Sequence, residues 1–414
     1  MSILINNIGK LMQVEEKPVA FVAGSDMSRV PFIENAWLLI EEDIIAGFGT
    51  MDTAPGVVPG AEIIDAKGCS VFPSFCDSHT HLVYAGSRER EFVDKIRGLS
   101  YEEIAKRGGG ILNSARRLHD TSEDELYEQS VRRAWEIIRF GTGAAEMKSG
   151  YGLTTEDELK MLRVIRRIKE DLPLTVKATF LGAHAIPDPY REDRDKYVDL
   201  IVNEMIPAVA AEKLADYVDV FCDKGFFTVR ETERILEQAI SYGMRPKIHA
   251  NELDFSGGIE VGVKYKALSV DHLECTDEQQ IAVLLGSGTM PTLLPGAAFF
   301  LNLKNPPART MINAGLPVAL ASDYNPGTSP SGNMKFVMSL ACIKMKMLPE
   351  EAINAATINS AYAMGLSETH GSIAVGKRAN VFITNNIPSY EFIPYAFTTN
   401  VVETVILNGE KITF

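Results

Sequence analysis

The stretch FCDSHTHLVYAGSRERE, residues Phe75 to Glu91, closes an apolar run that begins at Cys69 and places two histidines one residue apart. In a β-strand, residues i and i+2 point to the same side, so the imidazoles of His79 and His81 should share one face. Two neutral imidazoles on one face form half of a site for a divalent metal. This stretch therefore predicts a strand that ends in metal ligands.

Further short apolar runs follow the first, and most are separated by amphipathic segments such as 155–172 and 228–243, whose apolar residues recur at three and four. Continuous apolar runs are typical of strands buried on both faces of a parallel sheet. Eight strand–helix units in roughly 290 residues predict a (β/α)8 barrel. A doubly wound open sheet is the alternative, which the lack of GxGxxG after the first strand weakens. The eight runs are 69–79, 141–150, 174–184, 215–224, 245–251, 267–274, 288–296 and 316–327.

The two ends of the chain have a different pattern from the middle. Residues 1–68 and 370–414 alternate apolar and polar positions and break at Gly, Pro and Asp, which indicates short β-strands. The barrel is therefore expected over 69–369. Between its first two runs, the Gly triplet of RGGGI, residues 107–111, indicates a mobile loop near the barrel mouth.

Composition excludes several classes of protein. The formal net charge of −14 argues against binding of nucleic acid or an anionic membrane. Five scattered cysteines form no disulfide framework and suit a reducing cytosol. The first residues lack the features of a signal peptide, and no apolar run reaches about 18 residues, so we expect a cytoplasmic protein without a membrane span.

Polar residues with metal-binding chemistry recur where the predicted strands end. His184, His249, His272 and Asp323 close four later runs, and of the seven histidines only His119 and His370 lie elsewhere. Taken singly, each has a structural explanation: a buried histidine can be satisfied in a core, Asp271 can pair with His272, and Asp323 can cap a turn. Likewise, Arg88 can be a solvated charge and Tyr151 a packing residue. Their coincidence at strand ends favours a metal site at the C-terminal mouth, where barrel enzymes keep their active sites.

The chemistry that such a site supports is hydrolysis. Three nitrogen ligands and one oxygen ligand, from His79, His81, His249 and Asp323, suit zinc or iron, and a metal with an open position lowers the pKa of a bound water to about 7. Glu252 and His272 are placed to move protons or polarise a carbonyl group. A cation such as Arg88 at the mouth could hold a substrate carboxylate.

The sequence resembles the amidohydrolase superfamily in its set of motifs. These are HTH at residues 79–81, the two later strand-end histidines and the SD pair of the last strand. The segments DSHTHLVYAGSRERE, RGGGI, EMKSGYGL, LGAHAIP, KIHANE, DHLE, LLPG and SDYNPGTSP resemble more closely its branch that opens an imidazolone ring. The resemblance covers essentially the whole chain. GTGAAEMKSG departs from the Thr-rich second strand that is usual there, and RANVF has Asn380 where the superfamily usually has Asp; neither position is assigned to the site.

The resemblance implies a fold and a reaction. The terminal segments, 1–68 and 370–414, would pair into a small β-sandwich domain beside the barrel. Water would open the ring of 4-imidazolone-5-propanoate to N-formimidoyl-L-glutamate, the third step of histidine degradation, and a homodimer is expected. One zinc or iron ion would be held by the four ligands above.

The resemblance also implies roles for further residues. Arg88 would hold the propanoate carboxylate, while Tyr151 and His184 would contact the substrate. Glu252 and His272 would flank the ring and the attacking water, and Asp323 or His272 would take the proton of that water. The loop after the last strand would bind substrate through Asn325, Gly327 and Thr328.

Three alternatives compete with this interpretation, and the weakest is a cofactor-using barrel, because neither a Rossmann fingerprint nor a P-loop is present. A metal-dependent deaminase of a cyclic amidine or pyrimidine would share the pair His249 and Glu252 and the following His272, but its substrates generally lack a carboxylate arm for Arg88. A barrel kept only as a binding module would typically have lost metal ligands, all of which are present here. Ammonia release would support the deaminase, and a metal-free folded protein would support the binding module.

Overall fold

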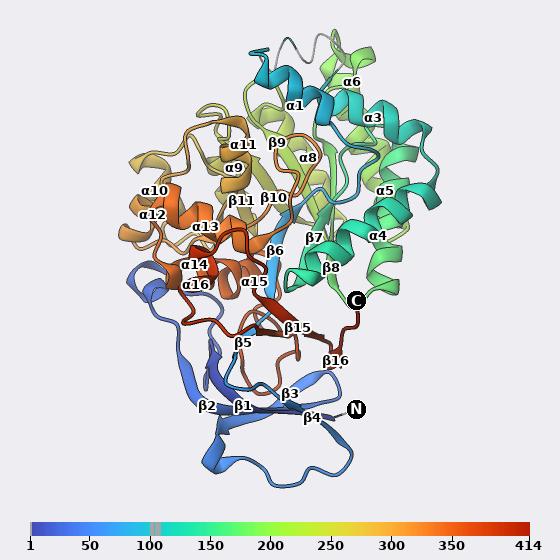
Figure 1. Cartoon of the computed structure of the whole chain (residues 1–414). Coiled ribbons are helices and arrows are strands. Elements are labelled where there is room, and N and C mark those ends of the chain that lie inside the picture. The colour runs from blue at the N-terminus through green and yellow to red at the C-terminus, as the bar shows by residue number, and fades with distance from the viewer. Residues whose placement is uncertain (1, 100–102, 104–108) are drawn as a thin grey trace.

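The computed structural model describes residues 2–99, 103 and 109–414, and its centre is a ring of eight parallel strands with helices outside it (Figure 1). The strands pair in chain order. The first and last meet through the backbone, where Asp323 N–H donates to the His79 carbonyl and His81 N–H to the Tyr324 carbonyl. The strands are β6 (Phe75–Thr80), β7 (Thr142–Lys148), β8 (Thr175–Ala183), β9 (Tyr217–Cys222), β10 (Arg245–Ala250), β11 (Ser269–His272), β12 (Met290–Leu293) and β13 (Ala319–Leu320).

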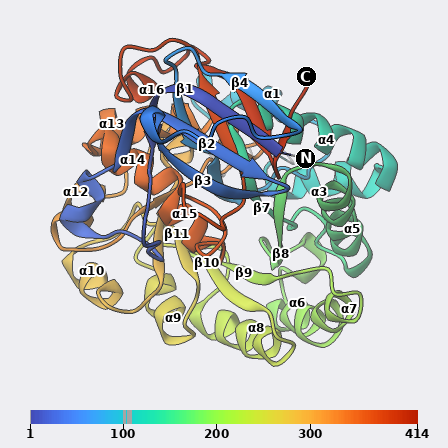
Figure 2. The same ribbon diagram turned by 90° about the horizontal axis from the view of Figure 1, so that it is seen from below.

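Seven of these strands lie inside their apolar runs and β6 extends one residue beyond its run, so the barrel prediction is confirmed. Helices separate the strands and form an outer layer, which Figure 2 shows as a ring seen from below. The described helices are α1 (Glu89–Ile96), α3 (Ile111–Asp120), α4 (Glu123–Arg139), α5 (Thr155–Asp171), α6 (Arg194–Leu200), α7 (Ile206–Ala211), α8 (Val229–Ser241), α9 (Gly258–Lys264), α10 (Glu278–Leu284), α11 (Pro295–Leu301), α12 (Ala308–Asn313), α13 (Met334–Met345), α14 (Pro349–Ala356), α15 (Ile358–Ala363) and α16 (Phe392–Tyr395).

The two helices predicted from periodicity begin with side-chain caps. Thr154 accepts a hydrogen bond from Asp157 N–H at the start of α5, and Thr228 forms a capping box with Glu231 at the start of α8. The apolar sides of the helices pack on the strands and form one large core with them.

The two ends of the chain form a second sheet below the barrel (Figure 1). Its order is β16–β15–β14–β5–β1–β2–β3, and β4 pairs with β1 in parallel. Residues such as Ile5, Leu38 and Val381 give this sheet its own buried apolar cluster. Its strands are β1 (Ser2–Met12), β2 (Phe32–Glu41), β3 (Ile44–Thr50), β4 (Ala61–Asp65), β5 (Ser70–Pro73), β14 (Val381–Thr384), β15 (Val402–Leu407) and β16 (Glu410–Lys411).

The first apolar run is divided between the two sheets. β5 pairs with β1 and β14 in the terminal sheet, whereas β6 begins two residues later in the barrel. The first two residues of the RGGGI segment, 107 and 108, fall outside the described residues, so its mobility stays a prediction. Within the described part of the chain, no helix is both long and apolar enough to cross a membrane.

Candidate metal centre and active site

All the residues singled out from the sequence gather at the C-terminal ends of the barrel strands. His79, His249 and His272 lie on β6, β10 and β11, and His81, Tyr151, His184, Glu252 and Asp323 follow their strands within a few residues. Most of them line a single cavity of about 600 Å³, together with Arg88, Asn325 and Thr328.

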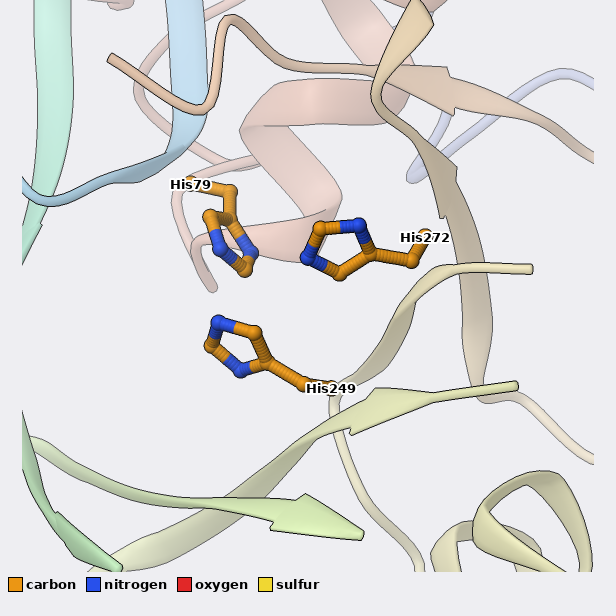
Figure 3. A group of neighbouring side chains, drawn as sticks. All are labelled: His79, His249 and His272. Atoms are coloured by element: carbon orange, nitrogen blue, oxygen red, sulfur yellow. The ribbon is translucent and has the colours of Figure 1, made fainter. Parts of the chain in front are cut away.

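Four ligand-type side chains converge at the bottom of this cavity. Asp323 Oδ1 lies 3.6 Å from both His79 Nε2 and His81 Nε2, and His249 Nε2 lies 3.3 Å from His81 Nε2. Figure 3 shows the rings of His79, His249 and His272 facing one another from separate strands. Among the described residues, three triads have their ligand atoms within 4.8 Å of one another: His79 with His81 and Asp323, His79 with His249 and His272, and His79 with Asp219 and Asp271.

The donor set fits a divalent metal. His79 is fully buried, and among the described residues its Nε2 has no hydrogen-bond partner. Its Nδ1 lies 2.6 Å from Asp271 Oδ2, which leaves the Nε2 lone pair directed at the other donors. A buried nitrogen without a partner is costly unless something coordinates it, so the arrangement supports a metal in this position.

A second aspartate faces a second histidine. Asp219 Oδ2 lies 2.9 Å from His249 Nδ1, and Asp219 Oδ1 accepts a hydrogen bond from His249 N–H at 3.1 Å. Asp271 pairs with His79 of another strand, not with the adjacent His272 that the sequence suggested as its partner. Each aspartate lies at the ring nitrogen that a metal would not use, which is how outer carboxylates orient histidine ligands.

Burial keeps the imidazoles in the neutral form that binds metals. It lowers the pKa of His79 well below its ordinary value, and the nearby Lys148 ammonium lowers it further. Burial and His184 lower the pKa of His81 in the same way, and burial and His249 that of His272. Neutral histidines with a free ring nitrogen are the common ligands of zinc and iron.

Three carboxyl groups at the mouth are biased toward their protonated forms. Burial raises the pKa of Asp323 to about 7. Burial and the neighbouring Asp323 charge raise the pKa of Glu252 to about 8, and burial and Glu252 raise that of Glu274 well above its ordinary value. Glu252 Oε2 and Glu274 Oε2 lie 3.7 and 4.0 Å from His272 Nδ1. Carboxylic acids whose pKa lies near neutral pH are suited to proton transfer.

The cation predicted to hold a carboxylate is fixed in place. Arg88 precedes α1 and is buried, and its Nε donates to Glu91 Oε2 at 2.9 Å. Glu91 in turn accepts from Gly110 N–H and Asn113 Nδ2. A Cβ at Gly327 would lie 2.2 Å from Arg88 Nη1, so the guanidinium occupies the space that glycine leaves open.

Two aromatic groups line the same wall of the cavity. Tyr151 and His184 have ring centroids 5.3 Å apart. Burial lowers the pKa of His184 to about 3, so it is neutral, and its Nδ1–H donates to the Gly150 carbonyl at 2.9 Å. Its Nε2 is therefore a hydrogen-bond acceptor, suited to a ring N–H.

The sequence interpretation missed the charged residues beneath the histidines. Lys148, Asp219 and Asp271 are fully buried, as are Glu146 and Lys247. A charge inside an otherwise apolar strand is the signal that could have revealed them, because such residues are rarely buried without a partner. Which carboxylate meets which histidine depends on pairing between strands and has no local signature.

Comparisons with known proteins agree with this architecture. The sequence model of the Amidohydrolase family matches residues 70–412. A protein of Christiangramia forsetii named imidazolonepropionase is 58% identical over 412 residues, with 100% of both chains covered. One of Geobacillus kaustophilus with the same name is 42% identical, covering 99% of this chain and 97% of its own.

Solved structures agree with the fold. The 5-methylcytosine deaminase of Klebsiella pneumoniae, solved with phosphonocytosine, superposes with a TM-score of 0.75 at 20% identity, covering 99% of this chain and 98% of its own. The guanine deaminase of C. acetobutylicum gives 0.73 at 14% identity, with 100% of both chains covered. At these identities the likeness extends to the fold alone.

Proposed function

This chain belongs to the amidohydrolase family and, within it, to the imidazolonepropionases, and on that premise we propose how its residues carry out the reaction. The substrate is 4-imidazolone-5-propanoate, whose ring C–N amide bond is hydrolysed to give N-formimidoyl-L-glutamate. The observation that carries the proposal is that Arg88, suited to a carboxylate, lines the same cavity as the convergent histidines and Asp323. The protein is an enzyme of the cytoplasm and acts as a homodimer.

The metal is held by His79, His81, His249 and Asp323, and it is zinc or iron. When bound, it supplies Lewis acidity that activates water and polarises the ring carbonyl. Three nitrogen donors and one oxygen donor form a borderline set that suits either metal. His272 stays outside the ligand set, and its Nδ1, which has no hydrogen-bond partner among the residues that the structure describes, supports a role in proton transfer.

The substrate lies between the histidines and Arg88. Arg88 pairs with the propanoate carboxylate through its Nη atoms, because its Nε is already bonded to Glu91. Tyr151 packs against the imidazolone ring of the substrate, and His184 Nε2 accepts a hydrogen bond from an N–H group of that ring. Asn325, Gly327 and Thr328 bind from the loop after β13, where Asn325 Oδ1 already accepts from the N–H groups of the other two.

Proton transfer is divided between His272, Glu252 and Asp323. Asp323 or His272 takes the proton of the attacking water, and His272 also stabilises the charge that develops on the carbonyl oxygen. Glu252 in its protonated form delivers a proton to the departing ring nitrogen. Its pKa of about 8 supports this role, because the group carries a proton at neutral pH.

The barrel domain comprises residues 69–369, and the β-sandwich domain comprises residues 1–68 and 370–414. This division follows the change of sequence pattern and assigns every proposed site residue to the barrel, although β5 at the start of the barrel range pairs within the terminal sheet.

A coupled assay tests the proposal. Urocanase generates the unstable imidazolone in place, and its ultraviolet absorbance, the mass of the product and the metal content are measured on one sample. We expect the product to be formimidoylglutamate and the protein to bind about one metal ion per chain. The His249→Ala variant should lose turnover. If metal is bound but the imidazolone decays no faster than without protein, the substrate assignment fails, and ammonia release from cyclic amidines and pyrimidines would then identify a deaminase.

A further inference from the structure

A cluster of charged side chains lies beneath the histidines inside the barrel, and we call it the buried charged cluster. All its members have 0% exposure, and they come from β7, β9, β10 and β11. Three carboxylates face two ammonium groups. The cluster consists of Glu146, Lys148, Asp219, Lys247 and Asp271.

Lys148 occupies the centre of this cluster. Its Nζ lies 2.8 Å from Asp219 Oδ2, 2.6 Å from Glu146 Oε1 and 3.9 Å from Asp271 Oδ2. The two aspartates are those that face the histidines. Asp219 Oδ2 is also the oxygen 2.9 Å from His249 Nδ1, and Asp271 Oδ2 is the one 2.6 Å from His79 Nδ1. The ammonium group therefore acts on the same oxygen atoms that orient the two rings.

We propose that Lys148 is a positioning residue for the metal: it holds Asp219, and with it Asp271, where each carboxylate fixes the proton on Nδ1 of its histidine. The inference rests on the proposed function, because it assumes that His79 and His249 present Nε2 to a metal. An imidazole ligates through an unprotonated nitrogen, and a carboxylate at the other nitrogen sets the tautomer and the ring orientation. Without the ammonium group, Asp219 and Asp271 would repel each other in a dry interior and turn away from the rings.

Lys247 provides a matched control. It is as buried as Lys148 and also lies 3.9 Å from Asp271 Oδ2. Like Lys148 it pairs with Glu146, through the other carboxylate oxygen, but it also donates to the carbonyls of Ser78 and Ala363. Among the described residues, it has no ion pair with Asp219. Removal of either lysine costs the barrel a buried charge, but only removal of Lys148 frees the carboxylate that faces His249.

The test is metal affinity, measured by chelator competition for Zn²⁺ and Co²⁺ on wild type, Lys148→Met, Lys247→Met, Asp219→Asn and the double variant Lys148→Met/Asp219→Asn. We expect Lys148→Met and Asp219→Asn each to raise the metal Kd about 10–100-fold, the range for lost outer partners of ligands. Lys247→Met should stay within about threefold. The metal Kd of the double variant should exceed that of the weaker-binding single variant by at most about threefold, because both changes act through one carboxylate. The visible spectrum of bound Co²⁺ should change in Lys148→Met and remain as in wild type in Lys247→Met.

Equal losses of affinity in the two lysine variants would overturn the inference, since they would indicate a general effect on the barrel. Wild-type affinity in Lys148→Met would overturn it as well, and so would additive effects in the double variant. If Lys148→Met does not fold, Lys148→Gln, which keeps a hydrogen-bond donor on a shorter side chain and removes the charge, carries the same expectation. A wild-type protein that binds no metal would instead contradict the proposed function, so the two failures are distinguishable.

Discussion

At the scale of single residues, the space for the Arg88 guanidinium is set by one missing side chain. Gly327 faces the end of Arg88, and a Cβ there would lie 2.2 Å from Nη1 and 2.4 Å from Cζ. The guanidinium is the far end of a flexible side chain, so it would move and the fold would not. Gly327 thus leaves room for the guanidinium through its lack of a side chain, and with it for the carboxylate that Arg88 is proposed to bind.

Gly327→Ala should therefore impair binding more than chemistry. We expect KM for the imidazolone to rise about tenfold, which corresponds to about 1.4 kcal/mol, with kcat little changed and the melting temperature within a few degrees. Gly56→Ala is the control, because a Cβ at Gly56 would meet nothing within 4 Å. An unchanged KM in Gly327→Ala would show that Arg88 does not hold the carboxylate in the position seen here.

How far the site could be predicted also differs between residues. His79 and His81 follow from the two-residue period of a strand, and His249, His272 and Asp323 from the rule that parallel strands expose their C-terminal ends at one mouth. The partners of these residues could not be predicted, because the pairing of Asp271 with His79 joins residues 192 positions apart.

At the scale of elements, one helix shapes the loop that carries Tyr151. Glu158 of α5 is fully buried. Its carboxylate accepts from Gly152 N–H at 2.7 Å, Leu153 N–H at 2.9 Å and Gly150 N–H at 3.1 Å. A Cβ at Gly152 would lie 2.3 Å from Glu158 N, so the loop also needs glycine to approach the helix. The segment KSGYGL and the start of α5 therefore form one unit.

Glu158→Ala should loosen this unit and the site together. Three backbone donors lose their acceptor, and unsatisfied buried donors cost about 1–3 kcal/mol each, so we expect a loss of about 3 kcal/mol or more in the free energy of unfolding. KM should rise as well, because Tyr151 lines the cavity. Denaturant unfolding and steady-state kinetics measure both, with the exposed Glu156→Ala of the same helix as control. Stability equal to that of the control would contradict this role.

The elements also show where sequence patterns stop being informative. Ser70–Pro73 and Phe75–Thr80 are fully buried and apolar enough to be one continuous run. They belong to different sheets because β5 pairs with β1 and β14, whereas β6 pairs with β7. These partners are distant in the sequence, so the division could not be predicted from the run itself.

At the scale of the whole molecule, a histidine outside the active site connects the barrel to the C-terminal segment. His370 is 6% exposed, and its ring nitrogens lie 3.0 Å from Thr175 Oγ1 on β8 and 2.8 Å from Thr369 Oγ1. Burial, together with the nearby Lys377 and Lys177 charges, lowers its pKa to about 4. The folded protein therefore keeps this ring neutral well below the pH at which the unfolded chain protonates it.

This difference makes stability depend on pH. Between pH 6.5 and pH 4 the unfolded chain binds a proton at His370 that the folded protein does not, so the free energy of unfolding falls as the pH falls through this window. His370 alone should cost about 2 kcal/mol between pH 7 and pH 5. Unfolding of wild type and His370→Gln at both pH values isolates the contribution, because the variant should lose about 2 kcal/mol less on acidification. Equal losses in the two proteins would contradict it.

The proposed reaction depends on one metal held by His79, His81, His249 and Asp323, with His272 left free for proton transfer. Anomalous diffraction from crystals of the metal-loaded protein, at the zinc and iron absorption edges, tests it most directly. We expect one anomalous peak about 2.0–2.2 Å from an imidazole nitrogen of each of the three histidine ligands and from an Asp323 oxygen. The absorption edge at which the peak appears would identify the metal. A peak coordinated by His272 in place of His81 and Asp323, or no peak at this site, would contradict it.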